Sequence, residues 1–195
     1  MSLYRMTEKN SVLYISCGIF KEELEYLVKE KGLDWDIVFL AAALHVNFDK
    51  LKAGLVEALE EKRKPGMDLR VVYGSCHPEM SGILDRYGAR KIKALNCLEA
   101  MVGPDEMKRL HAEAKTFFLS AGWVNNWEGM FALGKEDLDL DFKSMFRSYE
   151  RIVVFDTGVI PINEEKVLKF REFSGLRIER RRITLDHLFG LLRDM

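Results

Sequence analysis

The sequence predicts a single α/β domain with a mainly parallel sheet flanked by helices, layered as in Rossmann-type folds. Short apolar runs rich in β-branched residues alternate with longer amphipathic stretches. Several of the runs, such as VLYI, IVFL and IVVF, are apolar throughout. Parallel strands covered by helices on both faces have this character, and right-handed crossovers connect them.

The strand-like runs set the order of the elements. We expect strands over Val12–Ser16, Asp36–Leu40, Leu69–Tyr73, Lys91–Leu95, Thr116–Leu119, Arg151–Asp156 and Leu176–Arg180. Amphipathic patterns between them predict helices over Glu22–Lys31, Phe48–Lys62, Asn163–Phe173 and Leu185–Arg193. In the second of these helices, leucines recur every four residues and Asp49 is placed to cap the start. Gly175 is suited to end the third helix.

Length and composition indicate one folded unit. The chain has 195 residues, of which 48% are hydrophobic and 31% charged, so it can bury a core without disulfides. The loosest candidate boundary is Ala132–Leu138, and the part that follows holds too few elements for a separate core. We therefore predict one domain over residues 1–195.

Charge and hydropathy exclude several classes of partner. The 30 basic and 31 acidic side chains nearly cancel, so no bulk field attracts nucleic acid or lipid. No apolar run approaches the roughly 20 residues that span a bilayer, and the N-terminus lacks the apolar core of a signal peptide. Three cysteines are too few for a disulfide framework, and an odd number cannot all pair. We expect a cytoplasmic protein with reduced thiols and neither a membrane nor a nucleic-acid partner.

Three cysteines and one histidine follow strand-like runs. Cys17 lies in YISCG, Cys76 in VVYGSCHP and Cys97 in IKALNCLE, while His45 ends VFLAAALH. Because ligands bind at the carboxyl ends of parallel strands, we expect these side chains to converge there. Three thiolates and an imidazole form a tetrahedral set for zinc, and three cysteines also suit an iron–sulfur cluster. The residues alone leave two interpretations open: a shared metal site, with zinc marginally preferred, and cysteines that only pack in the core.

The segment around Cys76 has further chemical potential. Gly74 permits a turn, His77 offers an imidazole, and Pro78 is suited to the first position of a helix. A helix start at this point would lower the pKa of the Cys76 thiol. Cys76 is therefore a candidate catalytic nucleophile, and the alternative is a tight strand-to-helix turn.

The segment GWVNNWEGMF places two indoles around two amides. Trp123 and Asn126 are candidate cofactor-binding residues, because an indole stacks on planar ligands and an amide bonds to them. The alternative, slightly preferred, is a partly buried helix in which Trp123 and Trp127 share a face. Two weaker motifs are the Asp156-Thr157-Gly158 turn and the basic run RIERRR over Arg177–Arg182, which is typical of a solvated edge strand.

The ordered series of these motifs resembles an uncharacterised family, domain of unknown function 1638, found largely in methanogenic archaea and anaerobic bacteria. The resemblance runs from about Val12 to near the C-terminus and rests on Cys17-Gly18, Leu44-His45, Tyr73-Gly74-Ser75-Cys76, Asn96-Cys97, Gly122-Trp123 and Asp156-Thr157-Gly158. The sequence departs from the family pattern at Asn96, where Asp is usual, and at His77-Pro78.

Members of this family often occur beside corrinoid-dependent methyltransferases. The resemblance therefore implies an accessory role in corrinoid-linked methyl transfer or one-carbon metabolism, with a corrinoid protein or a methyltransferase as partner. It carries the metal-ligand assignment to Cys17, His45, Cys76 and Cys97, and it names no reaction. The competing hypothesis is a non-catalytic α/β module that binds a cofactor or a partner methyltransferase.

Overall fold

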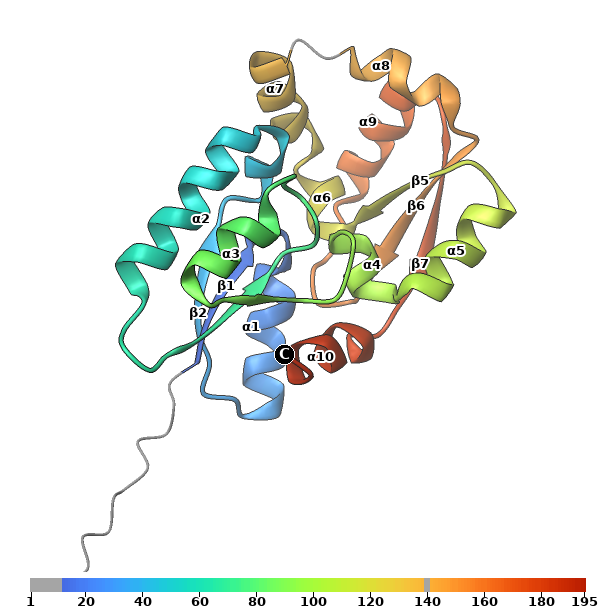
Figure 1. The fold of residues 1–195 in the computed structure, drawn as a ribbon. Helices are drawn as coiled ribbons and strands as arrows, with labels where there is room; N and C mark the ends of the chain where they lie inside the picture. The colour runs from blue at the N-terminus through green and yellow to red at the C-terminus, as the bar shows by residue number, and fades with distance from the viewer. Residues whose placement is uncertain (1–11, 139–140) are drawn as a thin grey trace, which may run out of the picture.

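The computed structural model describes residues 12–138 and 141–195, and its strands form two parallel sheets (Figure 1). The first sheet has the order β2-β1-β3-β4 and consists of β1 (Val12–Cys17), β2 (Asp36–Leu40), β3 (Asp68–Val72) and β4 (Arg90–Lys91). The second has the order β5-β6-β7 and consists of β5 (Thr116–Ser120), β6 (Arg151–Asp156) and β7 (Arg177–Arg182). The parallel α/β class is thus confirmed.

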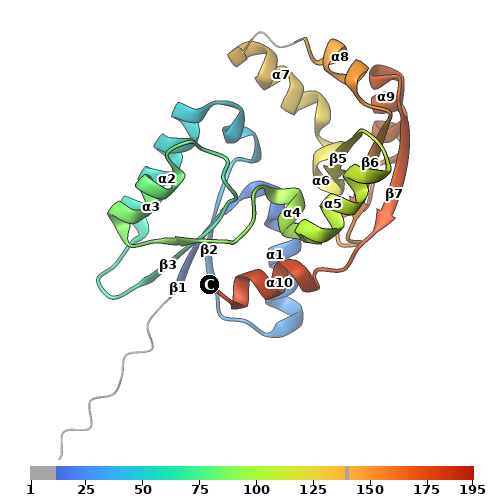
Figure 2. The ribbon, with the colours of Figure 1, turned by 45° about the vertical axis from the view of Figure 1, so that its right-hand side comes forward.

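The strands divide between two sheets instead of forming one. After β4 the chain runs through α4 (Cys97–Val102) and α5 (Pro104–Glu113) before β5 begins, and β4 pairs only with β3 among the described strands. We call the part around the first sheet the first lobe and the part around the second sheet the second lobe (Figure 2). That the two lobes fold as one domain stays a prediction.

Helices cover both faces of the first sheet. On one face lie α2 (Phe48–Lys62) and α3 (Met80–Tyr87), and on the other lie α1 (Lys21–Lys31) and α10 (Asp186–Arg193) (Figures 1 and 2). Two 3-10 turns, η1 (Gly18–Phe20) and η2 (Ala42–Val46), follow the carboxyl ends of β1 and β2. This double cover explains why the strands read as unbroken apolar runs.

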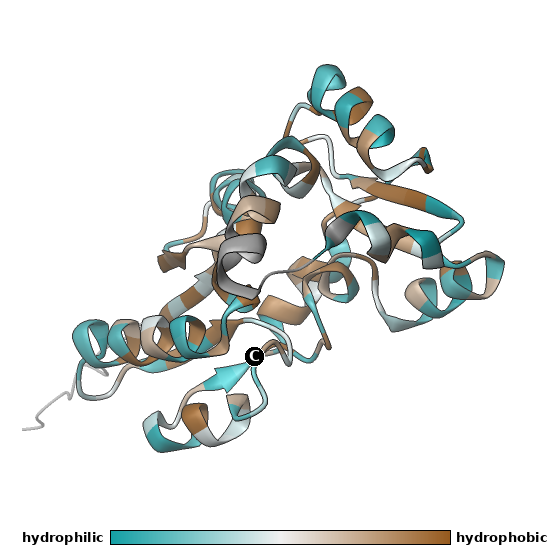
Figure 3. Ribbon diagram, turned by 90° about the horizontal axis from the view of Figure 1, so that it is seen from above, coloured by the Kyte–Doolittle hydropathy of each residue, from teal (hydrophilic) through white to brown (hydrophobic). Residues whose placement is uncertain are grey.

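The second lobe has the same layering. Ile152 and Val154 of β6 pack in a core with α6 (Ala121–Asn125), α7 (Trp127–Leu138), η3 (Phe146–Ser148) and α9 (Glu164–Ser174). The alternate residues Val153 and Phe155 pack with α5. The short helix α8 (Phe142–Met145) precedes η3. Figure 3 shows hydrophilic and hydrophobic stretches alternating along the helices, as amphipathic elements require.

The C-terminal helix ties the lobes together. After β7 the chain returns to the first lobe, where Leu185, Leu188 and Leu192 join the core of the first sheet. Nη1 of Arg70 donates to the carbonyl oxygen of Leu192 at 3.4 Å. The polypeptide therefore passes between the lobes twice, once through α4 and α5 and once before α10.

No helix within residues 12–138 and 141–195 has the length and apolar character that crossing a bilayer requires.

Candidate functional site

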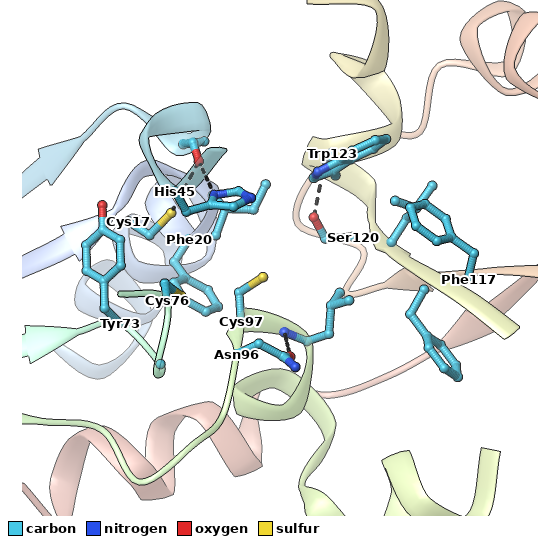
Figure 4. Close-up of a pocket in the computed structure, with 16 residues that line it drawn as sticks. Cys17, Phe20, His45, Tyr73, Cys76, Asn96, Cys97, Phe117, Ser120 and Trp123 are labelled. Carbon is cyan, nitrogen blue, oxygen red and sulfur yellow. Dashed lines mark hydrogen bonds between the residues drawn. The ribbon is translucent and has the colours of Figure 1, made fainter. Parts of the chain in front are cut away.

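A cavity of about 290 Å³ lies between the carboxyl edge of the first sheet and strand β5 of the second (Figure 4). Segments that follow all four strands of the first sheet contribute to its wall. The opposite wall comes from β5 and the helix after it, with Phe117, Ser120 and Trp123. The site is therefore built by both lobes.

Two glycines allow the loops of the first lobe to approach closely. A Cβ atom on Gly74 would lie 2.4 Å from the carbonyl oxygen of Leu95, and the backbone N–H of Ser75 donates to that same oxygen at 2.8 Å. A Cβ atom on Gly18 would lie 2.7 Å from the carbonyl oxygen of Leu40. These approaches bring together the loops that follow neighbouring strands.

All four residues predicted as metal ligands line this cavity. Cys17 ends β1, His45 lies in η2, Cys76 follows β3, and Cys97 is the first residue of α4. All three cysteines are free thiols. The convergence follows from the parallel topology, because the carboxyl ends of parallel strands share one edge.

Hydrogen bonding fixes the orientation of His45. Its Nδ1 lies 2.8 Å from the carbonyl oxygen of Ala42, so Nδ1 carries the proton and donates it. The Cys17 thiol donates to the same carbonyl oxygen at 3.9 Å. The other ring nitrogen of His45, Nε2, is left with a lone pair that can accept a hydrogen bond.

Burial keeps the three thiols protonated. It raises the pKa of Cys17 to about 11 and that of Cys97 to about 12, and it also raises the pKa of Cys76. Near pH 7 the site therefore presents neutral thiols, which are poor nucleophiles.

The predicted three-cysteine, one-histidine metal site is wrong. Within residues 12–138 and 141–195, no group of three or more His, Cys, Asp or Glu side chains is arranged to hold a metal ion. The four residues line the walls of one cavity, but they do not form such a group.

The helix expected to activate Cys76 begins too late in the chain. Helix α3 starts at Met80 with Glu79 at its N-cap, so Pro78 lies outside it. The pKa of Cys76 is raised, whereas the nucleophile hypothesis requires it to be lowered. The imidazole of His77 is buried, and its Nδ1 accepts from the backbone N–H of Glu79 at 2.9 Å. The structure gives Cys76 no general base at this turn.

The structure separates the two candidate cofactor-binding residues. Trp123 lines the cavity and packs edge-to-face against Phe117, with ring centroids 6.1 Å apart. Asn126 is exposed, does not line the cavity, and donates from Nδ2 to the carbonyl oxygen of Gly122 at 3.0 Å. The indole of Trp127 is buried in the second lobe and donates to the carbonyl oxygen of Lys166 at 3.3 Å.

The basic run RIERRR forms the edge strand β7, and its arginines are paired within the chain. Arg180 binds Glu164, Arg181 binds Glu106, and Arg182 binds Asp156. These pairs account for the charge of the run without an external anion. Asp156 also accepts from the backbone N–H of Gly158 at 2.8 Å, as a turn residue does.

Sequence reasoning missed the wall of the cavity contributed by β5. Phe117, Leu119 and Ser120 line it, and Ser120 is almost fully buried. Its Oγ accepts from the backbone N–H of Trp123 at 3.2 Å and caps α6. The run TFFLS carries a clear strand signal, but periodicity does not reveal which cavity a strand faces.

Fold and site together define a two-lobed parallel α/β protein with a largely apolar cavity at the strand ends. A family model described as "Protein of unknown function (DUF1638)" matches residues 39–192, and the chain belongs to this family. The resemblance seen in the sequence is thereby confirmed. No curated protein and no solved structure matches the chain.

Proposed function

We propose that the protein binds a small, uncharged and largely apolar ligand in the cavity between its lobes, as a binding module. One observation carries this proposal: the described residues that line the cavity include no Asp, Glu, Lys or Arg, although 31% of the chain is charged. A carboxylate or phosphate would enter this space without a counter-charge, which is costly. The position at strand ends and between lobes is typical of ligand sites.

His45 and Ser120, two of the polar residues on the wall, favour a ligand with one polar edge. Nε2 of His45 can accept a hydrogen bond, because Nδ1 is the donor to Ala42. The hydroxyl proton of Ser120 has no acceptor among residues 12–138 and 141–195, since its oxygen serves only as acceptor for the Trp123 N–H. A primary amide or a phenol on an aromatic ring complements this pair.

Benzamide and benzoate form a matched pair of probes, nearly equal in shape and different in charge. We expect benzamide to shift the resonances of the Trp123 indole N–H and the Ser120 backbone amide in ¹H–¹⁵N spectra. Benzoate should bind at least about tenfold more weakly, because its charge stays unpaired. Equal binding of both probes, or no binding of benzamide, contradicts the proposal.

A variant that fills the cavity supplies the second arm. Cys97→Phe adds bulk where the side chain faces the cavity (Figure 4), and it should abolish benzamide binding. Ala112→Phe adds the same ring on the exposed side of α5 and should leave binding unchanged. Both variants are compared with wild type by thermal unfolding first, so that loss of fold is not taken for loss of the site.

The partner rests on the family resemblance alone. We propose a cytoplasmic methyltransferase or corrinoid protein, in line with the genes that accompany the family. Co-elution of the purified chain with such a protein in size-exclusion chromatography is the expected outcome. Separate elution at micromolar concentration of both contradicts it.

A further inference from the structure

A second hollow of about 670 Å³ adjoins the cavity. His45, Phe117 and Trp123 line both spaces, so these three residues form their common boundary. We call the first space the inner cavity and the second the outer groove. The outer groove runs between η2 with the start of α2 on one side and α7 with Met145 on the other.

The outer groove is lined mainly by aromatic rings and thioethers. Phe48 lies at its wall with 53% of its surface exposed, and Val46, Met130, Phe131 and Met145 add further apolar side chains. Asp49 is the one charged residue among the described residues that line it. Surfaces of this kind accept flat apolar rings, because methionine adapts its shape and sulfur packs well against aromatic edges.

Trp123 is held in place at the boundary of the two spaces. It meets Phe131 edge-to-face at 5.2 Å and 73°, and Phe117 edge-to-face at 6.1 Å and 75°. The backbone N–H of Trp123 is anchored on Ser120. A ligand at this boundary therefore contacts an indole that is already ordered. Little side-chain conformational entropy is lost when it binds.

The volumes of the two spaces indicate whether a ligand fills the inner cavity alone or extends into the outer groove. The inner cavity, at about 290 Å³, lies just below the range of roughly 300–1,000 Å³ that is usual for ligand sites. The outer groove, at about 670 Å³, lies within that range. A molecule that fills the inner cavity alone leaves the exposed Phe48 and the two methionines in water.

We infer, on the basis of the proposed function, that the ligand is an elongated uncharged aromatic molecule that occupies both spaces. Its small polar head lies in the inner cavity beside the thiols, where it accepts from Ser120 and donates to Nε2 of His45, whose Nδ1 donates to Ala42. Its flat ring system lies in the outer groove against Trp123 and Met130.

Benzamide and 4-phenylbenzamide separate the two spaces experimentally. Both carry the same neutral amide head, and the second adds one ring along the molecular axis. We expect 4-phenylbenzamide to bind at least about tenfold more tightly by isothermal titration calorimetry, because burying an additional ring has roughly this effect. Equal affinity for the two probes overturns the inference and leaves the proposed function standing.

Met130→Lys tests whether the additional ring lies in the outer groove. The variant should lose the gain of 4-phenylbenzamide and keep the affinity for benzamide. Leu168→Lys makes the same change at a residue of α9 that is 57% exposed, and it should change neither affinity. Met145→Lys is the second groove variant if thermal unfolding shows that Met130→Lys has lost its fold.

The remaining outcomes are equally decisive. If both groove variants fold and keep the tenfold gain, the additional ring lies elsewhere and the inference fails. If neither probe binds the wild type, the proposed function fails and the inference with it. If the groove captures an apolar peptide and no elongated probe, its occupant is a protein segment and the inference fails.

Discussion

Glu23 is a buried carboxyl group at the junction of the lobes, and its ionisation should make the stability of the protein depend on pH. It lies in the first turn of α1 and is fully buried. Its Oε1 accepts from the hydroxyl of Thr157, at the end of β6, at 3.4 Å, and its Oε2 has no partner among residues 12–138 and 141–195. Burial raises the pKa of Glu23 to about 7, with Glu22 adding to the rise and the Thr157 hydroxyl and its own backbone N–H opposing it.

The sign of the effect follows from the two pKa values. The unfolded chain releases this proton near the ordinary value of 4.5, whereas the folded protein holds it up to about 7. Below pH 4.5 both states are protonated and the group has no effect on stability. As pH rises from 4.5 to 7 the unfolded state loses its proton first, so the free energy of unfolding falls. Above pH 7 the loss is constant at about 3 kcal/mol.

Glu23→Gln removes the titrating group and keeps the shape and an acceptor for Thr157. Urea unfolding at pH 5 and pH 8.5 compares this variant with wild type. The free energy of unfolding of the variant minus that of wild type should rise by about 2.5 kcal/mol from pH 5 to pH 8.5. This value follows from the difference between the folded and unfolded pKa of Glu23. Glu22→Gln, one position earlier and exposed, should show no comparable change. A relative stability of Glu23→Gln that stays constant between pH 5 and pH 8.5 refutes the reasoning.

Three further predictions concern the close approach, the thiols and the junction of the lobes. Gly74→Ala should lower the free energy of unfolding by roughly 2–4 kcal/mol in urea titrations, because the added Cβ would lie 2.4 Å from the Leu95 carbonyl oxygen. Gly82→Ala, where the added Cβ meets nothing within 4 Å, should leave the free energy of unfolding unchanged or raise it. Iodoacetamide at pH 7 should modify Cys97 far more slowly in the folded protein than in urea, because the folded structure raises the pKa of this half-buried thiol to about 12. Equal rates contradict a neutral Cys97 thiol. Thermal unfolding should be one transition by far-UV circular dichroism and by tryptophan fluorescence, because α10 follows β7 and packs in the first-lobe core; two separate transitions contradict this.

The strands were predictable because a strand that is buried on both faces has apolar residues at successive positions. VLYI and IVVF are apolar at every position, and the structure places them in β1 and β6 between two helical layers. The predicted strand Lys91–Leu95 shrinks to Arg90–Lys91, because the backbone at Leu95 bonds to the Ser75 N–H beyond the end of the ladder. The division into two sheets depends on which strands pair, and local periodicity carries no information about pairing.

The site shows the same limit at the level of side chains. Parallel topology is enough to bring Cys17, Cys76 and Cys97 to one edge, and the sequence contains that topology. Metal binding requires more, namely sulfur atoms and a ring nitrogen that converge on a common point. The direction in which each thiol and the His45 ring point is a tertiary effect, set in part by the bond from Nδ1 to the Ala42 carbonyl. It leaves no mark on the spacing of the residues.

Neutral thiols and an uncharged wall are two consequences of one arrangement. The close approaches at Gly18 and Gly74 draw the loops of the first lobe together, and β5 of the second lobe closes the space over them. Water removed from this space no longer stabilises thiolate, so the pKa of each cysteine rises. The same desolvation disfavours any charged ligand and favours one that brings apolar surface and a few hydrogen bonds. Opening the space to water, as loss of the Gly74 approach would, should therefore lower the thiol pKa values and weaken selection against benzoate together.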